Sequence, residues 1–322
     1  MIEASAFWVV APGRGELRPE RLPAVTAGSA RVKTLFSAIS RGTEALVFHA
    51  RVPESEWESM RAPHQVGSFS LPVKYGYANV GRVMQGPPEL EGRHVFCLYP
   101  HQTEFVVSAQ SLVVLPDAVP PERGVLAANL ETALNALWDA RPLIGDRISV
   151  VGGGVVGALV AFLACHGLAS DVELVDTNPD RRALAEAFGA RFALPEAATP
   201  ERDLVFHASG SEAGLQTALE LAQPEASIIE LSWYGDRAVS LRLGSKFHVR
   251  RLKLCSSQVG TVSPHARARF THRERLKLAL SLCADSKLDA LFERDVAFHE
   301  LPRIMPEVLS SRSRALCQRV RY

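Results

Sequence analysis

The sequence contains few cysteines, and none of them are spaced as a pair. The five cysteines are scattered along 322 residues and never form a CxxC motif. The chain therefore indicates neither a disulfide framework nor a zinc finger. This usage favours a reducing compartment, the cytoplasm. The N-terminus also lacks the basic region of a secretory signal, because an acid, Glu3, precedes its short apolar run.

An excess of charge of either sign is also missing. Lys and Arg total 36 against 35 Asp and Glu, which leaves a net charge of +1, too small to attract nucleic acid or an anionic membrane at long range. One apolar run, residues 148–165, approaches the length of a membrane span. Its three consecutive glycines predict a strand, a turn and a helix instead. We therefore expect neither a nucleic-acid nor a membrane partner.

The length and composition are those of an ordinary globular protein with two domains, at 47% hydrophobic and 22% charged residues. Short β-branched and aromatic runs bounded by Gly, Pro or Asp fill the first part of the chain. From about residue 120, helical and strand patterns alternate, which predicts parallel strands joined by helical crossovers. We expect a β-rich domain over residues 1–120 and an α/β domain over residues 121–284.

A glycine-rich stretch, VVGGGVVG, follows a predicted strand and opens a predicted helix, so that Gly152, Gly154 and Gly157 have the G-x-G-x-x-G spacing. The first glycine makes a tight turn, the second lets the backbone approach a pyrophosphate, and the third lets helix and strand pack closely. The helix head, with Val155 and Val156, offers free amides to that anion. This pattern predicts a dinucleotide site; a purely structural glycine-rich crossover is the alternative.

The next predicted strand ends in Asp176, about 20 residues beyond the glycines, where a carboxylate accepts hydrogen bonds from an adenosine ribose. A carboxylate there repels the 2′-phosphate of NADP, so NAD is favoured as the cofactor. Arg181 and Arg182 lie close enough in sequence to favour NADP instead. The alternative is that both are solvated surface charges without a role in cofactor choice. Ser209, at the end of a later predicted strand, is a further expected cofactor contact.

The order of these elements resembles the medium-chain dehydrogenase/reductase superfamily, which includes zinc alcohol, sorbitol and threonine dehydrogenases. The resemblance covers essentially the whole chain and is carried by FSAISRGTEA, VKYGYANVGRV, EGRHVFCL, TEFVV, LVVLPD, LETALNALWDA, GDRISVVGGGVVG and VELVDTNPDRRALAEAFGA. Within the superfamily, ISRGTE and GYANVGRV are similar to members related to bacteriochlorophyllide-type dehydrogenases. The resemblance implies a β-rich, GroES-like catalytic domain completed by residues 285–322, a doubly wound Rossmann domain, and a homodimer.

The residues that resemble the family's zinc ligands depart from its pattern. Zinc-dependent members have Cys in the place of Ser40, His and Glu in the places of Tyr77 and Ala78, and Cys or an acid in the place of Ala128. Ser, Tyr and Ala are not zinc ligands of the usual kind. The family's four-cysteine structural lobe is also missing, since Cys97 alone lies near the matching region. We expect neither metal.

Reduction of a carbonyl then needs another group to stabilise the developing oxyanion, and one well-placed donor is typically worth about 3 to 4 kcal/mol. Tyr77, in the place of the lost histidine, is the first candidate for proton donor or acceptor. The alternative, given equal weight, is that Tyr77 only packs in the core of the barrel. Tyr75, Tyr99 and His101 are candidates to line a substrate pocket.

The polar segment SRGTE precedes an apolar run and has the composition of a turn. The resemblance makes it the floor of an active site, with Ser40 among the catalytic residues and Arg41 reaching the cofactor pyrophosphate, a role that suits a guanidinium. Thr43, or the glycine before it, takes the place of a family hydroxyl that relays protons. Glu44 binds substrate, pairs with Lys74 or Arg41, or is exposed.

A second polar cluster lies on one predicted helix face, because Ala128, Glu131, Thr132 and Asn135 fall at i, i+3, i+4 and i+7. The family points the position of Ala128 into its cleft, so this face is expected to border the nicotinamide, with Thr132 as a cofactor contact. Glu131 is then a base or an orienter of Tyr77. The alternative is a helix carboxylate bonded to a neighbouring loop.

These observations favour a zinc-independent, NAD-linked oxidoreductase that transfers hydride between nicotinamide and a small alcohol or ketone. Two alternatives stay open. One is an NADPH-linked reductase of conjugated alkenes or quinones. The other is a non-catalytic NAD-binding protein that kept the fold after losing its metal centre.

Overall fold

The computed structural model describes residues 3–168 and 171–322, which form two compact units. The β unit comprises Met1–Ala128 and Leu276–Tyr322, and the α/β unit comprises Asn129–Arg275. The chain passes from one unit to the other within helices α3 (Ala127–Ala140) and α7 (His272–Leu282). The predicted boundaries lie after residues 120 and 284.

The β unit is built from two sheets, in which neighbouring strands are antiparallel except for the parallel pair β16 and β17. The smaller sheet has the order β2 (Arg14–Arg21), β1 (Glu3–Ala11), β5 (Val73–Lys74), β4 (Val66–Gly67). The larger sheet has the order β16 (Val296–Ala297), β17 (Gln318–Arg321), β3 (Ser29–Ile39), β6 (Asn79–Gln85), β7 (His94–Cys97), β9 (Val113–Val114), and β8 (Glu104–Ser108) also pairs with β3. Both sheets bury alternate apolar side chains, as half-buried strands do.

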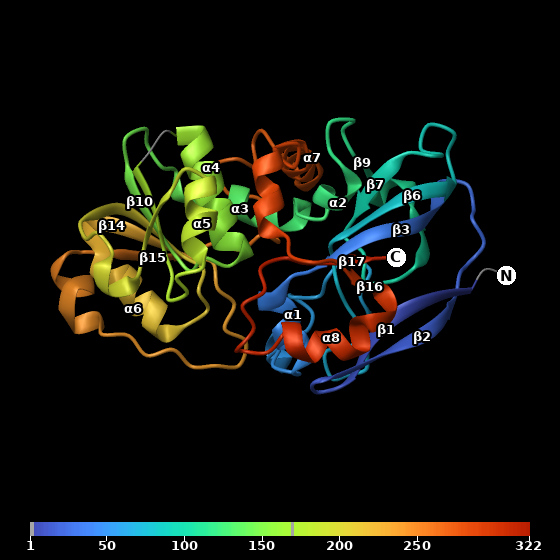
Figure 1. Cartoon of the computed structure of the whole chain (residues 1–322), viewed down its shortest axis with the longest axis horizontal. Helices are drawn as coiled ribbons and strands as arrows, with labels where there is room; N and C mark the ends of the chain where they lie inside the picture. Colours follow the sequence, from blue (N-terminus) through green and yellow to red (C-terminus); the bar gives the residue numbers. More distant parts are fainter. Residues whose placement is uncertain (1–2, 169–170) are drawn as a thin grey trace. The chain divides into compact units, whose positions relative to one another are not determined.

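The last strand of the chain belongs to the β unit. β17 pairs antiparallel with β3, and Gln318 lies opposite Ile39 (Figure 1). The chain therefore returns to its first unit after the α/β unit is complete, as the resemblance implies. β2 was not predicted, because its sequence, RGELRPER, is charged and has no strand-like apolar alternation.

The polar segment after β3 is helical, which corrects its interpretation as a turn. Helix α1 runs over Arg41–Phe48 and buries Leu46, Val47 and Phe48. Glu44 lies in the first turn, where a carboxylate is favoured by the positive end of the helix. Its Oε1 accepts the amide of Ser40 at 2.7 Å, so the polar residues satisfy the start of the helix.

The α/β unit contains one parallel sheet of six strands, which confirms the predicted α/β fold class. Its order is β12 (Arg191–Ala193), β11 (Asp171–Val175), β10 (Arg147–Val151), β13 (Arg202–His207), β14 (Ala222–Glu230), β15 (Lys253–Ser256). The strand order reverses between β10 and β13, which is where doubly wound sheets bind ligands at their carboxyl ends.

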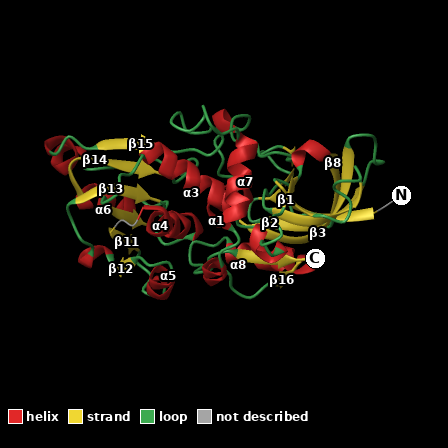
Figure 2. Cartoon of the chain, turned by 90° about the horizontal axis from the view of Figure 1, so that it is seen from above, coloured by secondary structure: helices red, strands yellow, loops and turns green. Residues whose placement is uncertain are grey.

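Helices connect consecutive strands of this sheet and pack against it (Figure 2). They are α4 (Val155–Leu168), α5 (Arg181–Ala187) and α6 (Glu212–Leu221). The β unit also contains α2 (Pro121–Gly124) and α8 (Leu301–Val308). The apolar run at residues 148–165 is β10 followed by α4, as predicted, and no helix in the described ranges is both long and apolar enough to cross a membrane.

Candidate cofactor and catalytic sites

The glycine loop between β10 and α4 has no room for side chains at two of its three positions. Gly152 has φ +107°, and a Cβ there would lie 2.5 Å from the Ser209 amide nitrogen. A Cβ on Gly157 would lie 1.9 Å from the Gly152 carbonyl oxygen. Gly154 is exposed, and nothing lies within 4 Å of its Cβ position. This geometry fits the turn, the close packing and the open approach that a pyrophosphate needs.

Asp176 follows β11 and contacts the glycine loop directly. Its Oδ2 accepts the amide of Gly153 at 2.6 Å, and its Oδ1 accepts the amide of Asn178 at 2.7 Å. A carboxylate has about four acceptor positions, so capacity remains for ribose hydroxyls. Val155 and Val156 are partly exposed at the head of α4, where helix amides have no intrahelical partners. The residues present therefore fit a dinucleotide.

The two arginines after Asp176 differ in their surroundings. The guanidinium of Arg182 lies 4.9 Å from the ring centroid of Phe192, so it packs on that ring in a cation–π contact. The stem of Arg181 lies against the loop, with its Cγ 3.2 Å from the Cβ position of Gly153. Of the two arginines, Arg181 is therefore the one that packs against the glycine loop.

In the β unit, Tyr77 is grouped with two of the other predicted catalytic residues. Its hydroxyl is hydrogen-bonded to the side chains of Ser40 and Thr43. Burial, followed by the charge of Glu44, raises the pKa of Tyr77 to about 12, although the two hydroxyl contacts act in the opposite direction. The phenol therefore keeps its proton at neutral pH, as a proton donor must.

Behind this group lies a buried chain of hydrogen bonds that sequence reasoning did not predict. His101 Nε2 lies 3.0 Å from Glu44 Oε2, and His101 Nδ1 lies 2.7 Å from Ser37 Oγ. Ser37 in turn lies 2.9 Å from the hydroxyl of Tyr322. Glu44 is therefore neither exposed nor paired with Lys74, one of the partners considered for it. Its partner is 57 residues away in sequence, and no short-range pattern connects them.

Arg41 is bound to the C-terminal segment of the chain. Its Nε, NH1 and NH2 donate to the carbonyls of Val308 at 3.0 Å, Ala315 at 2.6 Å and Ser313 at 2.9 Å. These three bonds fasten α1 to the residues before β17. A guanidinium has five N–H donors, so these bonds do not use all of them. The expected contact of Arg41 with a cofactor pyrophosphate stays a prediction.

In the α/β unit, Glu131 of α3 forms a buried ion pair. Its Oε1 accepts from Arg275 Nε at 3.1 Å, and Arg275 also donates to Asn135 Oδ1 at 2.7 Å. Burial raises the pKa of Glu131, and the charge of Arg275 opposes that rise. This ion pair is a structural use of the carboxylate, and the roles of Glu131 as a base and of Thr132 as a cofactor contact stay predictions.

The positions that resemble zinc ligands carry the hydroxyls of Ser40 and Tyr77 and the methyl group of Ala128. None of the three offers the thiolate or imidazole that zinc prefers. Within residues 3–168 and 171–322, no group of three or more His, Cys, Asp or Glu side chains is placed to hold a metal ion. Both ring nitrogens of His101 are already hydrogen-bonded to Glu44 and Ser37.

The chain is similar in sequence to several dehydrogenases. It is 25% identical over 267 residues to D-guloside 3-dehydrogenase of Escherichia coli, covering 73% of this chain and 75% of the relative. It is 30% identical over 159 residues to (R,R)-butanediol dehydrogenase of Bacillus subtilis, but that match spans 40% of this chain and 46% of the relative. The match to L-threonine 3-dehydrogenase of Ruegeria pomeroyi, at 27% identity, spans 36% of that protein. No family model matches the chain.

Solved structures share the fold over the whole chain. A candidate zinc-binding dehydrogenase of Sinorhizobium meliloti bound to NADP has a TM-score of 0.80 at 18% identity, and the match covers 100% of both chains. Galactitol-1-phosphate dehydrogenase of Escherichia coli has a TM-score of 0.79 at 16% identity, covering 99% of this chain and 100% of the other. The chain therefore has the fold of these dehydrogenases.

Proposed function

We propose that this protein is an NAD(P)-dependent oxidoreductase of the alcohol dehydrogenase type, which transfers hydride between nicotinamide and a small alcohol, polyol or ketone. The observation that carries the proposal is the glycine loop, in which Gly152 and Gly157 exclude side chains and Gly154 stays open. The relatives support it, because they are dehydrogenases by name. When bound, the nicotinamide supplies or takes up the hydride.

NAD is the preferred cofactor in this proposal. Asp176 is held beside the loop by the amides of Gly153 and Asn178, so a negative charge is fixed near the ribose position. A 2′-phosphate would meet that charge at close range. The positive charge of Arg181, whose stem packs against the loop, favours NADP instead. A solved neighbour from Escherichia coli, with a TM-score of 0.76 at 14% identity, is complexed with NADH, whereas the Sinorhizobium meliloti protein is bound to NADP.

We further propose that the reaction proceeds without zinc. The support is the chemistry of the side chains at the three ligand positions, Ser40, Tyr77 and Ala128, since alkyl and neutral hydroxyl groups are poor zinc ligands. The Tyr77 hydroxyl takes over the stabilisation of the carbonyl oxygen. It donates its proton as the oxygen becomes an alkoxide, and the hydrogen bonds from Ser40 and Thr43 stabilise the phenolate that is left.

A homodimer is the proposed assembly. β15 is the last strand of the six-stranded sheet, paired on one side with β14. All four of its residues, Lys253–Ser256, are exposed. An exposed edge strand is a ready template for pairing with a second copy. Cys97, Cys255, Cys283 and Cys317 carry free thiols, which supports the proposal of a reducing compartment such as the cytoplasm.

The test is an assay of purified protein with NAD⁺ and a panel of secondary alcohols and polyols, followed by NADH absorbance, before and after treatment with a chelator. We expect turnover that chelation does not remove. The Tyr77→Phe variant should bind NADH like the wild type and lose turnover by about a hundredfold or more. Turnover restored only by zinc would overturn the zinc-free mechanism.

The same assay separates the two alternatives. NADPH-dependent reduction of an enone or quinone, without alcohol oxidation, would favour the reductase. Saturable NADH binding with no turnover on either panel would favour the non-catalytic protein.

A further inference from the structure

A chain of hydrogen bonds at the carboxyl ends of β13 and β14 reaches an exposed serine. His207 and Glu230 are register partners on these strands. His207 Nδ1 lies 2.8 and 2.9 Å from the two carboxylate oxygens of Glu230, and His207 Nε2 lies 2.6 Å from Ser209 Oγ. The imidazole is fully buried, and Ser209 is exposed.

The donors around Glu230 fix where the imidazole carries its proton. Burial raises the pKa of the carboxyl, but hydrogen bonds from His207 and Ser232 outweigh this and bring its pKa below the ordinary value. The amide of Ser232 donates to Oε1 at 2.7 Å, and the hydroxyl of Tyr234 donates to Oε2 at 3.0 Å. An ionised carboxylate only accepts, so a neutral His207 carries its proton on Nδ1 and accepts at Nε2.

This direction continues to the surface. A neutral His207 takes the hydroxyl proton of Ser209, so Ser209 Oγ can only accept from its other neighbours. It accepts the amide of Ser211 at 3.2 Å and the hydroxyl of Ser211 at 2.9 Å. Ser211 Oγ in turn accepts the amide of Gly214 at 3.0 Å and keeps a second acceptor position. A ligand hydroxyl can donate to that position, whereas an ionised phosphate oxygen cannot.

Glycines seat the serine pair, Ser209 and Ser211, beside the cofactor loop. A Cβ on Gly214 of α6 would clash with Ser209 Oγ and lie 3.0 Å from His207 Nε2, so the cluster packs directly against the backbone of this helix. A Cβ on Gly152 would lie 2.5 Å from the Ser209 amide nitrogen. The serine pair thus adjoins the turn at which the dinucleotide is proposed to bind.

The same three side chains have the order of a nucleophile, a base and an acid in serine hydrolases. A hydrolase also needs amides that are free to bind an oxyanion. The neighbouring amides are engaged here: that of Gly210 donates to Ser232 Oγ at 3.0 Å, that of Ser211 to Ser209 Oγ at 3.2 Å, and that of Gly214 to Ser211 Oγ. This geometry favours recognition of a hydroxyl over acyl transfer.

We propose that Ser211 accepts a hydrogen bond from a ribose hydroxyl of the dinucleotide, and that Ser209, His207 and Glu230 are positioning residues that hold Ser211 as an acceptor. This inference rests on the proposed function and adds a hydroxyl subsite to the cofactor site. The central residue is Glu230, because replacing its carboxylate by an amide lets the imidazole take the other tautomer without changing its shape.

The test combines histidine ¹⁵N NMR with NADH binding for the wild type and for Ser209→Ala, Glu230→Gln and the double variant. We expect the Nδ1–H tautomer in the wild type and the Nε2–H tautomer in Glu230→Gln. Each single variant should bind NADH about tenfold more weakly, the size of one lost hydrogen bond at the upper end of the usual range. The double variant should be no weaker than either single one, because both changes remove the same contact.

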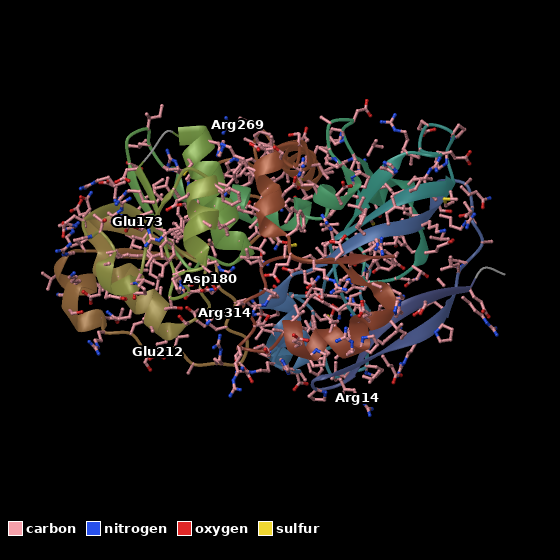
Figure 3. All side chains as sticks on the ribbon, viewed as in Figure 1. Arg14, Glu173, Asp180, Glu212, Arg269 and Arg314 are labelled. Carbon is pink, nitrogen blue, oxygen red and sulfur yellow. The ribbon has the colours of Figure 1, made fainter. Side chains whose placement is uncertain are left out.

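Glu212→Gln is the matched control. Glu212 is the first residue of α6 (Figure 3), and its exposed carboxylate accepts the Ser240 amide at 3.0 Å. The change removes one negative charge near the same edge and should leave NADH affinity unchanged. Wild-type affinity in Ser209→Ala, or additive losses in the double variant, would overturn the subsite. Covalent labelling of Ser209 by a fluorophosphonate would overturn it in favour of acyl chemistry. Absence of NADH binding by the wild type itself would instead reject the proposed function, and the subsite with it.

Discussion

Each unit contains a buried histidine held between a carboxylate and a serine, and the two arrangements differ in where they end. In the β unit, His101 joins Glu44 to Ser37 and Tyr322, and His101 and Glu44 are 1% and 3% exposed. In the α/β unit, the chain from Glu230 through His207 ends at the exposed Ser209 and Ser211.

This difference separates stability from recognition. The buried residues of the enclosed chain are not accessible to a ligand. Its carboxylate, Glu44, stabilises the fold by accepting hydrogen bonds from His101 and from the amide of Ser40. An open chain can transmit the orientation of a buried imidazole to a surface hydroxyl. We therefore expect the enclosed chain to contribute mainly to the free energy of unfolding and the open chain mainly to cofactor affinity.

The largest expected effect comes from removing the two carboxylates. Glu44→Ala leaves His101 and the Ser40 amide without their partner in a closed interior, which should lower the free energy of unfolding by about 3 kcal/mol. Glu230→Ala should cost about 1 kcal/mol, because the side chain of Glu230 is 13% exposed and water can replace it. Urea unfolding of both variants measures the difference. Equal losses would remove the distinction between the chains.

The glycine loop offers the next comparison. Gly157→Ala places a Cβ against the Gly152 carbonyl, so it should lower the free energy of unfolding by about 1 to 3 kcal/mol and also weaken NADH binding. Gly154→Ala meets no atom of the protein, so it should fold like the wild type and still lose NADH affinity. Thermal unfolding and NADH titration test both. A Gly154→Ala variant with full affinity would mean that no ligand approaches this position.

Asp176→Asn should change the choice of cofactor by a smaller amount. The amide oxygen can still accept one loop amide, while the charge that opposes a 2′-phosphate is lost. We expect NADH affinity to fall and NADPH affinity to rise, so that their ratio shifts by about tenfold. Competitive titration measures this ratio, with Asp180→Asn as a control on an exposed aspartate before α5 (Figure 3). An unchanged ratio would make Arg181 the determinant.

The smallest effect should be a pH dependence at the alkaline end. Burial is the first cause of a raised pKa at all five tyrosines, which are Tyr75, Tyr77, Tyr99, Tyr234 and Tyr322. The unfolded chain ionises its tyrosines near pH 10, before the folded chain does. Their contribution to stability is therefore complete below about pH 10 and is lost as the pH rises towards the folded values.

Absorbance at 295 nm, which reports phenolate, should accordingly stay low in the native protein near pH 10.5 and rise when urea unfolds it at the same pH. Early phenolate absorbance without unfolding would contradict the burial of these side chains. Tyr77→Phe removes the group whose pKa is about 12 and should leave the onset unchanged.

The sequence predicts the α/β unit better than the β unit, for physical reasons. The roles of Gly152, Gly157 and Asp176 depend on short spacings around one turn, so the pattern is visible along the chain. Glu44 in α1 and His101 between β7 and β8 are 57 residues apart and meet only in the folded β unit, which leaves no local signal. His207 and Glu230 meet because they are register partners on neighbouring parallel strands, at a separation of 23 residues.

Local chemistry also misled the prediction at one place. Helix α1 begins in a polar segment with the composition of a turn, and its helical state depends on burial of Leu46, Val47 and Phe48 after the polar start. Tertiary packing therefore outweighs local propensity there. The expected roles of Ser40, Thr43 and Tyr77 depend on the family resemblance, and the structure places these three side chains together.

The most direct measurement is a fluorescence titration of the wild-type protein with NADH and with NADPH. The proposed cofactor site predicts saturable binding of NADH that is tighter than that of NADPH. Failure of both dinucleotides to bind at saturating concentration would contradict it, however well the glycine loop matches the expected geometry.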